Sequence, residues 1–207
     1  MRGDGGRGRR EGWGLPRHRA SGSPRWSPDG RWIAYDFLTA DGTRDIYVID
    51  STGGRPRPVV QHTATDRVPN WSRDGKWIYF SSNRNGGRDE IFRVPASGGE
   101  PALITDQGGY VAVESVDNRI LYYTKTAGGS SPLFSRPLAG GGEEQVLPSV
   151  FYRAFAVNAE GIYYTEQILT RLRETPGFGL SVSPDGKKIL YTLFSESSDL
   201  VLVENFR

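Results

Sequence analysis

Trp26-Ser27-Pro28-Asp29-Gly30-Arg31-Trp32-Ile33-Ala34-Tyr35 is the stretch of sequence that decides the fold. It returns 45 residues later as Trp71-Ser72-Arg73-Asp74-Gly75-Lys76-Trp77-Ile78-Tyr79-Phe80. The same spacing relates two more pairs of segments: Ile46-Tyr47 with Ile91-Phe92, and Gly53-Gly54 with Gly98-Gly99. Several segments that keep one spacing over this length indicate an internal structural repeat.

Three weaker copies follow in the sequence, at Asp117–Tyr123, Gly161–Tyr164 and Ser183–Tyr191. Each copy contains an isoleucine at the place of Ile33, and these isoleucines are Ile78, Ile120, Ile162 and Ile189. The last interval is shorter than the others by about one strand and a turn, and no counterpart of Asp45-Ile46-Tyr47 lies between Thr165 and Phe178. We therefore expect the fourth unit to be degraded.

Each unit is predicted to contain four short strands. In the first unit these are 24–27, 31–37, 45–50 and 56–60, separated by turns that are rich in Gly, Asp and Pro. The alternation of apolar residues along 33–37 is typical of a strand that packs on one face. A four-stranded antiparallel unit that repeats every 40 to 45 residues is a propeller blade. The predicted fold is all-β, an incomplete β-propeller of about four to five four-stranded antiparallel blades.

The expected organisation is a Gly/Arg-rich tail followed by one propeller domain. The tail covers 1–22 and is expected to be disordered, and the propeller covers 23–207. The predicted blades are 23–67, 68–110, 111–150, a degraded unit at 151–177, and 178–207. The last unit ends after its third strand, and residues 14–17 are a candidate for a closing strand.

The charge of the chain is unevenly distributed. Residues 1–22 carry six arginines against two acids, whereas the remainder has 20 basic and 22 acidic residues. The predicted propeller body therefore has no basic field that would favour nucleic acid. No apolar run approaches the length of a membrane span, and the tail lacks the apolar core of a signal peptide. We expect a cytoplasmic protein if the chain stands as given, and a periplasmic one if it is part of a longer exported or membrane-anchored protein.

The repeat residues closely resemble those of TolB-like (WD40-like) β-propellers. The resemblance depends on the run at 26–35, on Arg44-Asp45-Ile46-Tyr47-Val48 and on Gly53-Gly54, and it covers about residues 14–207. The same repeat occurs in the non-catalytic propellers of dipeptidyl-peptidase-IV-type enzymes. The ending at 199–207 looks like that of propellers fused to bacterial winged-helix regulators or Ser/Thr kinases. The resemblance implies a protein-binding or sensory propeller, usually of six or more blades.

The sequence offers no catalytic constellation. It has no cysteine, only His18 and His62 as histidines, and no Gly-x-Ser-x-Gly elbow, so a nucleophile with its base is not expected. The turn aspartates stand singly in different blades, unlike the clustered oxygens of a calcium site. We expect no metal and no cofactor. The repeated aromatic residues are expected to pack between blades; they are Trp26, Trp32, Trp71, Trp77, Tyr122 and Tyr163.

The remaining candidates are the loops that join one blade to the next. These loops, 61–69, 104–110 and 147–153, should open on one face around the centre of the propeller. They carry aromatic and charged residues of the kind that interfaces favour, namely His62, Asp66, Arg67, Tyr110, Tyr152 and Arg153. We predict that a protein or peptide partner binds at this face.

Three functions remain open from the sequence. The first is a non-catalytic protein- or peptide-binding scaffold, and the second is a sensory or regulatory fragment of a winged-helix regulator or kinase. The third, disfavoured by the shortage of histidines, is the propeller domain of a peptidase or lyase. An incomplete ring would also expose blade edges, so self-association is expected to be possible.

Overall fold

The computed structural model confirms the predicted all-β, incomplete β-propeller. It describes residues 21–164, 175–182, 188–194 and 199–204, and all of the regular structure within these ranges is β-strand. The strands form five antiparallel sheets, of which three have four strands, one has two and one has three among the described residues. The Gly/Arg-rich tail up to residue 20 and the possible closing strand at 14–17 lie outside the described residues.

The first two sheets come from the two strongest sequence repeats. The first sheet contains, in spatial order, β1 (Ser21–Trp26), β2 (Trp32–Leu38), β3 (Arg44–Asp50) and β4 (Arg57–Val60). The second contains β5 (Asp66–Trp71), β6 (Trp77–Ser82), β7 (Glu90–Pro95) and β8 (Ala102–Leu103). Each sheet is a meander in which every strand pairs with the next one along the chain.

The third to fifth sheets come from the weaker repeats. The third contains β9 (Ala112–Glu114), β10 (Ile120–Thr124), β11 (Ser130–Pro137) and β12 (Glu144–Phe151). The fourth pairs β13 (Phe155–Val157) with β14 (Ile162–Tyr164), and the fifth contains β15 (Thr175–Val182), β16 (Lys188–Phe194) and β17 (Asp199–Glu204).

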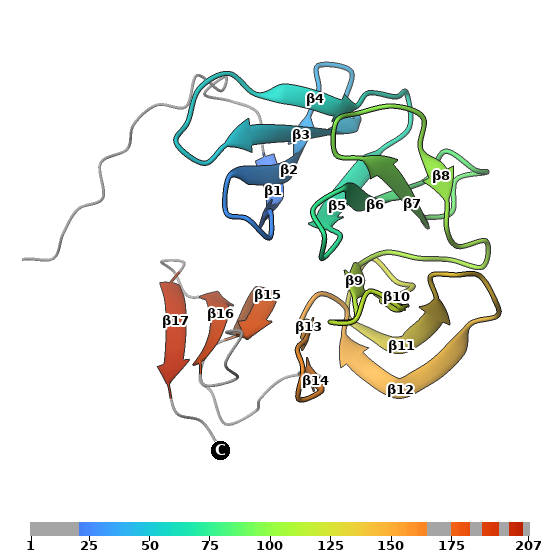
Figure 1. Ribbon diagram of the computed structural model, residues 1–207, viewed down its shortest axis with the longest axis vertical. Coiled ribbons are helices and arrows are strands. Elements are labelled where there is room, and N and C mark those ends of the chain that lie inside the picture. Colours follow the sequence, from blue (N-terminus) through green and yellow to red (C-terminus); the bar gives the residue numbers. More distant parts are fainter. Residues whose placement is uncertain (1–20, 165–174, 183–187, 195–198, 205–207) are drawn as a thin grey trace, which may run out of the picture.

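The five sheets are arranged radially in an arc. In Figure 1 the first strand of each sheet lies nearest the centre and the last strand lies at the periphery. The first sheet (blue) and the fifth (red) form the two ends of this arc. Apolar side chains of the first and second, second and third, and third and fourth sheets pack together, and each connection between sheets runs from an outer strand to the next inner strand.

A serine–aspartate pair closes the turn between the first and second strand of each full sheet. In the second sheet Ser72 Oγ donates to Asp74 Oδ1 at 2.7 Å and accepts from Trp77 N at 2.9 Å. The Ser27–Asp29 and Ser115–Asp117 pairs repeat this arrangement at 2.5 and 2.6 Å. Turn chemistry thus explains why serine and aspartate recur in the motif.

Stacked aromatic pairs show that the three full sheets are copies of one another. Each pair lies across the second and third strands, with centroids 5.9–6.1 Å apart and ring planes 25–26° from parallel. The pairs are Tyr35–Tyr47, Phe80–Phe92 and Tyr123–Phe134. Aliphatic and aromatic side chains from neighbouring sheets then form the cores between the blades.

The structure corrects one expectation about blade packing. Trp71 is buried at 7% exposure, as predicted, but its repeat counterpart Trp26 is 62% exposed. The other four predicted packing aromatics are half-buried: Trp32, Trp77, Tyr122 and Tyr163. The prediction for Trp26 was wrong: Trp71 packs in the core between the first and second sheets, and this surrounding is not repeated around Trp26.

Candidate binding site at the centre of the arc

Two predicted loops are shorter than the sequence suggested. Strand β5 already begins at Asp66, so Asp66 and Arg67 lie on a strand, and β12 continues to Phe151. The loop between β8 and β9 contains Tyr110, as expected, while Tyr152 and Arg153 lie between β12 and β13. The predicted residues thus come from the connections that lead into the second, third and fourth sheets.

Four of the six predicted residues meet in one place. The guanidinium of Arg67 lies 5.5 Å from the ring centroid of Tyr110, and that of Arg153 lies 5.4 Å from the same ring. Arg153 also lies 5.3 Å from the Tyr152 ring, and the two tyrosine rings are 5.8 Å apart. We call Arg67, Tyr110, Tyr152 and Arg153 the arginine–tyrosine cluster. Both tyrosines are buried and both arginines are half-buried.

Arg153 connects distant parts of the chain. Its Nη2 donates to the Tyr110 hydroxyl at 2.8 Å, and its Nη1 donates to Ser23 Oγ of β1 at 3.1 Å. Ser23 and Arg153 are 130 residues apart in sequence. This contact brings the first sheet to the cluster, which therefore draws on residues from the first sheet to the entry of the fourth.

Matched β-bulges shape the first strands next to the cluster. The pairing shifts between Gly22 and Arg25 in β1 and, 45 residues later, between Arg67 and Asn70 in β5. Within these bulges Ser23 and Val68 have positive φ, 50° and 55°. A β-branched residue seldom adopts this conformation, and bulges commonly redirect side chains near functional sites. The bulge in β5 lies directly beside Arg67.

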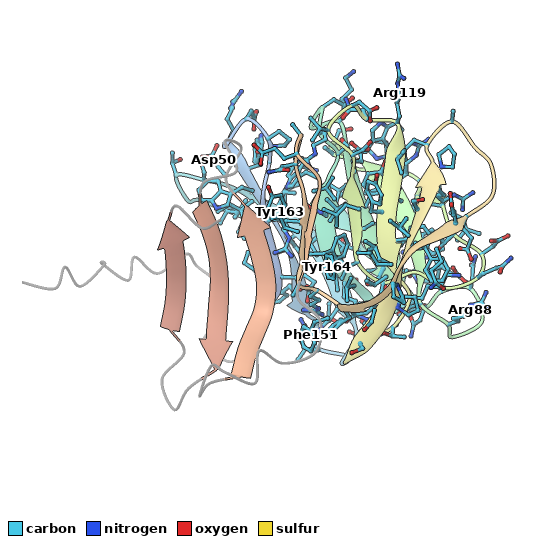
Figure 2. The ribbon with its side chains drawn as sticks, turned by 90° about the horizontal axis from the view of Figure 1, so that it is seen from below. Asp50, Arg88, Arg119, Phe151, Tyr163 and Tyr164 are labelled. Atoms are coloured by element: carbon cyan, nitrogen blue, oxygen red, sulfur yellow. The ribbon has the colours of Figure 1, made fainter. Side chains whose placement is uncertain are left out.

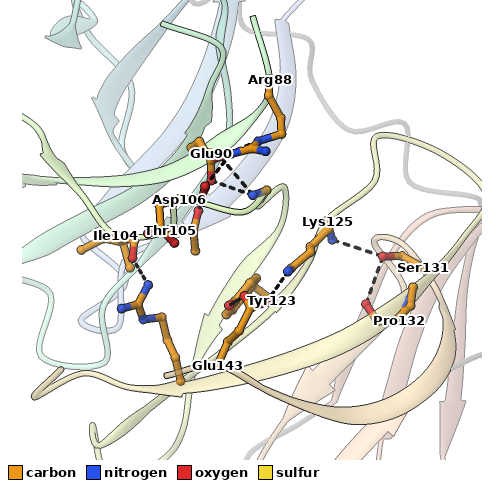
Figure 3. A network of polar contacts seen from close by, with 12 residues as sticks. Arg88, Glu90, Ile104, Thr105, Asp106, Tyr123, Lys125, Ser131, Pro132 and Glu143 are labelled. Carbon is orange, nitrogen blue, oxygen red and sulfur yellow. Dashed lines mark hydrogen bonds and ion pairs between the residues drawn. The ribbon is translucent and has the colours of Figure 1, made fainter. Parts of the chain in front are cut away.

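A fixed loop holds Tyr110. Its backbone N–H donates to Thr124 O at 2.7 Å, while the Thr124 hydroxyl donates to Tyr152 O at 2.9 Å. One residue of β10 therefore anchors both tyrosines. The buried Glu90 carboxylate accepts hydrogen bonds from Thr105 Oγ1 at 2.7 Å and from Gly108 N at 2.9 Å, which fixes the preceding part of the loop (Figure 3).

Among the described residues, the charged groups at the cluster are mainly arginines. Burial lowers the pKa of Arg25, a neighbour on β1, and the positive charge of Arg153 lowers it further. Asp89 provides negative charge next to these arginines. Its two carboxylate oxygens accept hydrogen bonds from Arg67 Nη2 at 3.0 and 3.1 Å. Because like charges repel at short range, an anionic group would be stabilised here.

The other two predicted residues take different places. Asp66 is fully buried and pairs with Arg84, whose Nη2 lies 2.9 Å from each carboxylate oxygen. His62 is exposed. Its ring Nδ1 accepts a hydrogen bond from Ala64 N at 2.9 Å, and its backbone N–H donates to Asp45 Oδ1. Neither of these sets of hydrogen bonds includes the arginine–tyrosine cluster.

Sequence reasoning missed three residues at this site: Ser23, Arg25 and Asp89. The 45-residue repeat contained a signal for two of them. Ser23 is the counterpart of Val68 and Arg25 is the counterpart of Asn70, and each pair lies on the first strand of its sheet. Asp89 could not have been found in this way, since its importance comes from pairing with Arg67 across the second sheet.

The described part of the chain limits the chemistry available. Within it, no group of three or more His, Asp or Glu residues is placed to hold a metal ion.

The strands end at two opposite faces, and Figure 2 shows Arg119 at one end of the sheets and Phe151, next to Tyr152, at the other. No helix in the described part of the chain is long and apolar enough to cross a membrane.

Radial meander sheets whose first strands meet around a cationic, aromatic centre define the chain as a β-propeller protein. The family model of the TolB beta propeller domain matches residues 16–174. The chain belongs to this family. A search of curated proteins found no match.

Solved structures show the same fold. TolB from Acinetobacter baumannii superposes with a TM-score of 0.71 at 21% identity over 92% of this chain, which spans 53% of that TolB chain. A chain of a nidogen/laminin complex gives 0.68 at 11% identity, covering 88% of this chain and 74% of that one. The propeller domain of the trilobed protease from Pyrococcus furiosus gives 0.57 at 17% identity, covering 89% and 82%. At these identities the likeness concerns the fold alone.

Proposed function

We propose that the chain is a non-catalytic β-propeller scaffold that binds a protein or peptide partner at the arginine–tyrosine cluster. The observation that carries the proposal is the convergence of Arg67 and Arg153 on the ring of Tyr110, with Arg25 adding further positive charge. Tyr and Arg are the residues most often found at the energetic centre of protein interfaces. The excess positive charge favours a partner segment with a carboxylate.

The positions of the cluster residues support this proposal. The tyrosines are held by Thr124 and the loop by Glu90, so the binding groups are already ordered and binding would cost little conformational entropy. A relative with the same fold appears in a nidogen/laminin complex, which is an assembly of two proteins. The non-catalytic part of the proposal is supported by His62, whose hydrogen bonds involve Ala64 N and the Asp45 carboxylate and no hydroxyl that could act as a nucleophile.

Selection of peptides from a random displayed library tests the proposal. The wild-type chain serves as bait, and recovered peptides are then measured by titration against Arg67→Ala/Arg153→Ala. We expect the peptides to contain Asp, Glu or a free carboxyl terminus. Losing two charged contacts to a partner carboxylate should weaken binding at least tenfold, since each charged hydrogen bond contributes about 1.5–3 kcal/mol.

A matched control separates the cluster from general charge. Arg119→Ala removes an exposed arginine at the opposite end of the sheets and should leave the affinity unchanged (Figure 2). Circular dichroism verifies that all variants are folded. Selected peptides that bind the double variant as tightly as the wild type would contradict the proposed site, and a library that yields no binder would contradict the proposed function.

A further inference from the structure

A cleft lies between the first two sheets, at the end of the strands opposite the arginine–tyrosine cluster. Its volume is about 340 Å³, which is within the range of small-molecule sites. The first sheet lines it with the turn after β1 and the starts of β2 and β4, and the second sheet with the turn after β5 and the connection from β7 to β8. These segments all come to the end of the sheets at which Figure 2 shows Asp50 and Arg119.

Two tryptophans provide the aromatic part of the lining. Trp32 is half-buried and packs on the core between the two sheets, and Trp71 is a buried member of that core. The turns of the two sheets approach each other here, since a methyl group added at Gly75 would lie 3.8 Å from Pro28 Cδ. Because Trp32 is less buried than Trp71, it is the aromatic side chain that a ligand in the cleft can reach.

Two carboxylates provide hydrogen-bond acceptors. In both Asp29 and Asp74, Oδ1 accepts the hydrogen bonds of the repeated turn, one from a serine hydroxyl and one from a backbone N–H. The serine hydrogen bond, followed by the backbone one, lowers the pKa of each carboxyl, so both are ionised at neutral pH. The turn uses one oxygen of each carboxylate and leaves Oδ2 for other contacts.

Arg57 provides hydrogen-bond donors and connects the two sheets. Its Nη1 donates to Ser97 O at 3.1 Å and its Nη2 donates to Ala96 O at 2.8 Å. A guanidinium has five N–H groups, so these two bonds fix its position and leave donors for a ligand. Arg57 and Ser97 are both exposed lining residues, and the Ser97 hydroxyl adds a group that can donate or accept.

Charges of both signs surround the cleft in near balance. Besides its hydrogen bonds, Asp29 is influenced by the positive charge of Arg31. Asp74 likewise lies 3.4 Å from Lys76 Nζ. Together with Arg57, three basic groups are thus near two carboxylates, and a ligand charge of either sign would meet repulsion as well as attraction. This balance favours a neutral ligand with many hydrogen-bonding groups.

We propose that the cleft binds a short neutral saccharide. The C–H groups on one face of a sugar ring carry a small positive charge and pack on the negative face of an aromatic ring, which Trp32 provides. Sugar hydroxyls donate to carboxylates, here Asp29 and Asp74, and accept from a guanidinium, here Arg57. The same chemistry recognises a free saccharide and the end of a glycan chain. The proposal does not depend on the peptide-binding function.

A printed array of mono- to tetrasaccharides, probed with the wild-type chain, tests the proposal. The array holds neutral sugars built from hexoses and N-acetylhexosamines, and matched charged sugars built from uronic acids and glucosamine. We expect the neutral sugars to be bound and their charged counterparts to be bound less. Calorimetry with the best array sugar in free form then separates the two sources. A free saccharide binds in solution, whereas a glycan end is bound only when attached through its reducing sugar.

The repeat supplies a matched control for the carboxylate. Asp29→Asn keeps an oxygen for the hydrogen bonds of its turn but loses the charge, and the affinity should fall about tenfold, as for a lost hydrogen bond to a charged acceptor. Asp117 makes the same turn contacts, with Ser115 Oγ at 2.6 Å and Arg119 N at 3.2 Å, and lies outside the cleft lining. Asp117→Asn should therefore bind like wild type.

A second matched pair tests the aromatic wall. Trp32 and Trp77 are both half-buried and occupy the same repeat position, but only Trp32 lines the cleft. Trp32→Leu should lose most of the saccharide binding and Trp77→Leu should retain it, with circular dichroism to verify that all variants are folded. An array without a neutral binder, a preference for charged sugars, or binding that survives both Asp29→Asn and Trp32→Leu would each overturn the proposal.

Discussion

The paired tryptophans allow one substitution to be measured in two surroundings. Replacement of Trp71 by alanine removes a side chain that is 7% exposed and packs in the core between the first and second sheets. The same replacement at Trp26 removes a side chain at the equivalent repeat position that is 62% exposed. Chemistry and register are thus held constant while burial changes.

The expected cost at Trp71 follows from its contacts. Truncating a buried aromatic residue to alanine lowers the free energy of unfolding by about 3–5 kcal/mol through lost burial and a residual cavity. Within this figure, the hydrogen bond from Nε1 to Arg25 O contributes about 1 kcal/mol. Trp26→Ala leaves no cavity in a blade contact, and we expect a change within about 0.5 kcal/mol, as for most surface substitutions.

Urea denaturation followed by far-UV circular dichroism measures both variants. A shift of the midpoint with an unchanged slope reports a change in stability rather than in the denatured state. Trp71→Phe, which keeps an aromatic ring but loses the N–H, should have an intermediate effect. Equal losses for Trp71→Ala and Trp26→Ala would refute the reasoning that burial determines the cost of losing this tryptophan.

Two further predictions concern the loop before Tyr110 and the repeated turn. Gly109→Ala should destabilise the fold by about 1–3 kcal/mol, because its new methyl group would lie 2.6 Å from Thr105 Oγ1 and 2.7 Å from Ile91 Cγ1. Gly128→Ala, with no neighbour within 4 Å, should be nearly neutral in the same urea assay, and equal effects would contradict this reasoning. The hydrogen bond from Ser72 holds the pKa of Asp74 below its usual value, so this carboxylate stabilises the fold above about pH 4, and its contribution is lost as the pH falls through the lowered pKa. Ser72→Ala should raise the pKa of Asp74 in a carboxyl NMR titration and reduce the loss of stability in acid; an unchanged titration would count against the turn contact.

The sequence predicted the strands well because their signals are local. Turn residues such as Asp29 and Gly30 act within a few positions, and the alternation along 33–37 needs only one strand. The exposure of Trp26 could not be predicted from these signals. Its residue type and spacing match those of Trp71, and the difference depends on the surroundings that each tryptophan meets in the folded chain.

The candidate site was predicted in part, for a related reason. Loop position identified Arg67, Tyr110, Tyr152 and Arg153, but it also included Asp66, the residue directly before Arg67 on β5. Successive side chains on a strand point to opposite faces, so Asp66 pairs with Arg84 while Arg67 reaches Tyr110. The contact between Arg153 and Ser23 depends on the curvature of the whole arc, which accumulates over four sheets and has no local sequence signal.

The radial order of the sheets also determines how the molecule should come apart. Each sheet gains its tertiary stabilisation from its neighbours along the arc, so the folding energy is close to a sum of nearest-neighbour contacts, as in a linear array. A terminal member of such an array has one contact to break, whereas an interior member has two. Opening should therefore start at the ends of the arc and reach the second and third sheets last. Slow amide exchange, resistance to proteases and the ordered tyrosines of the cluster should thus persist together in the same interior region.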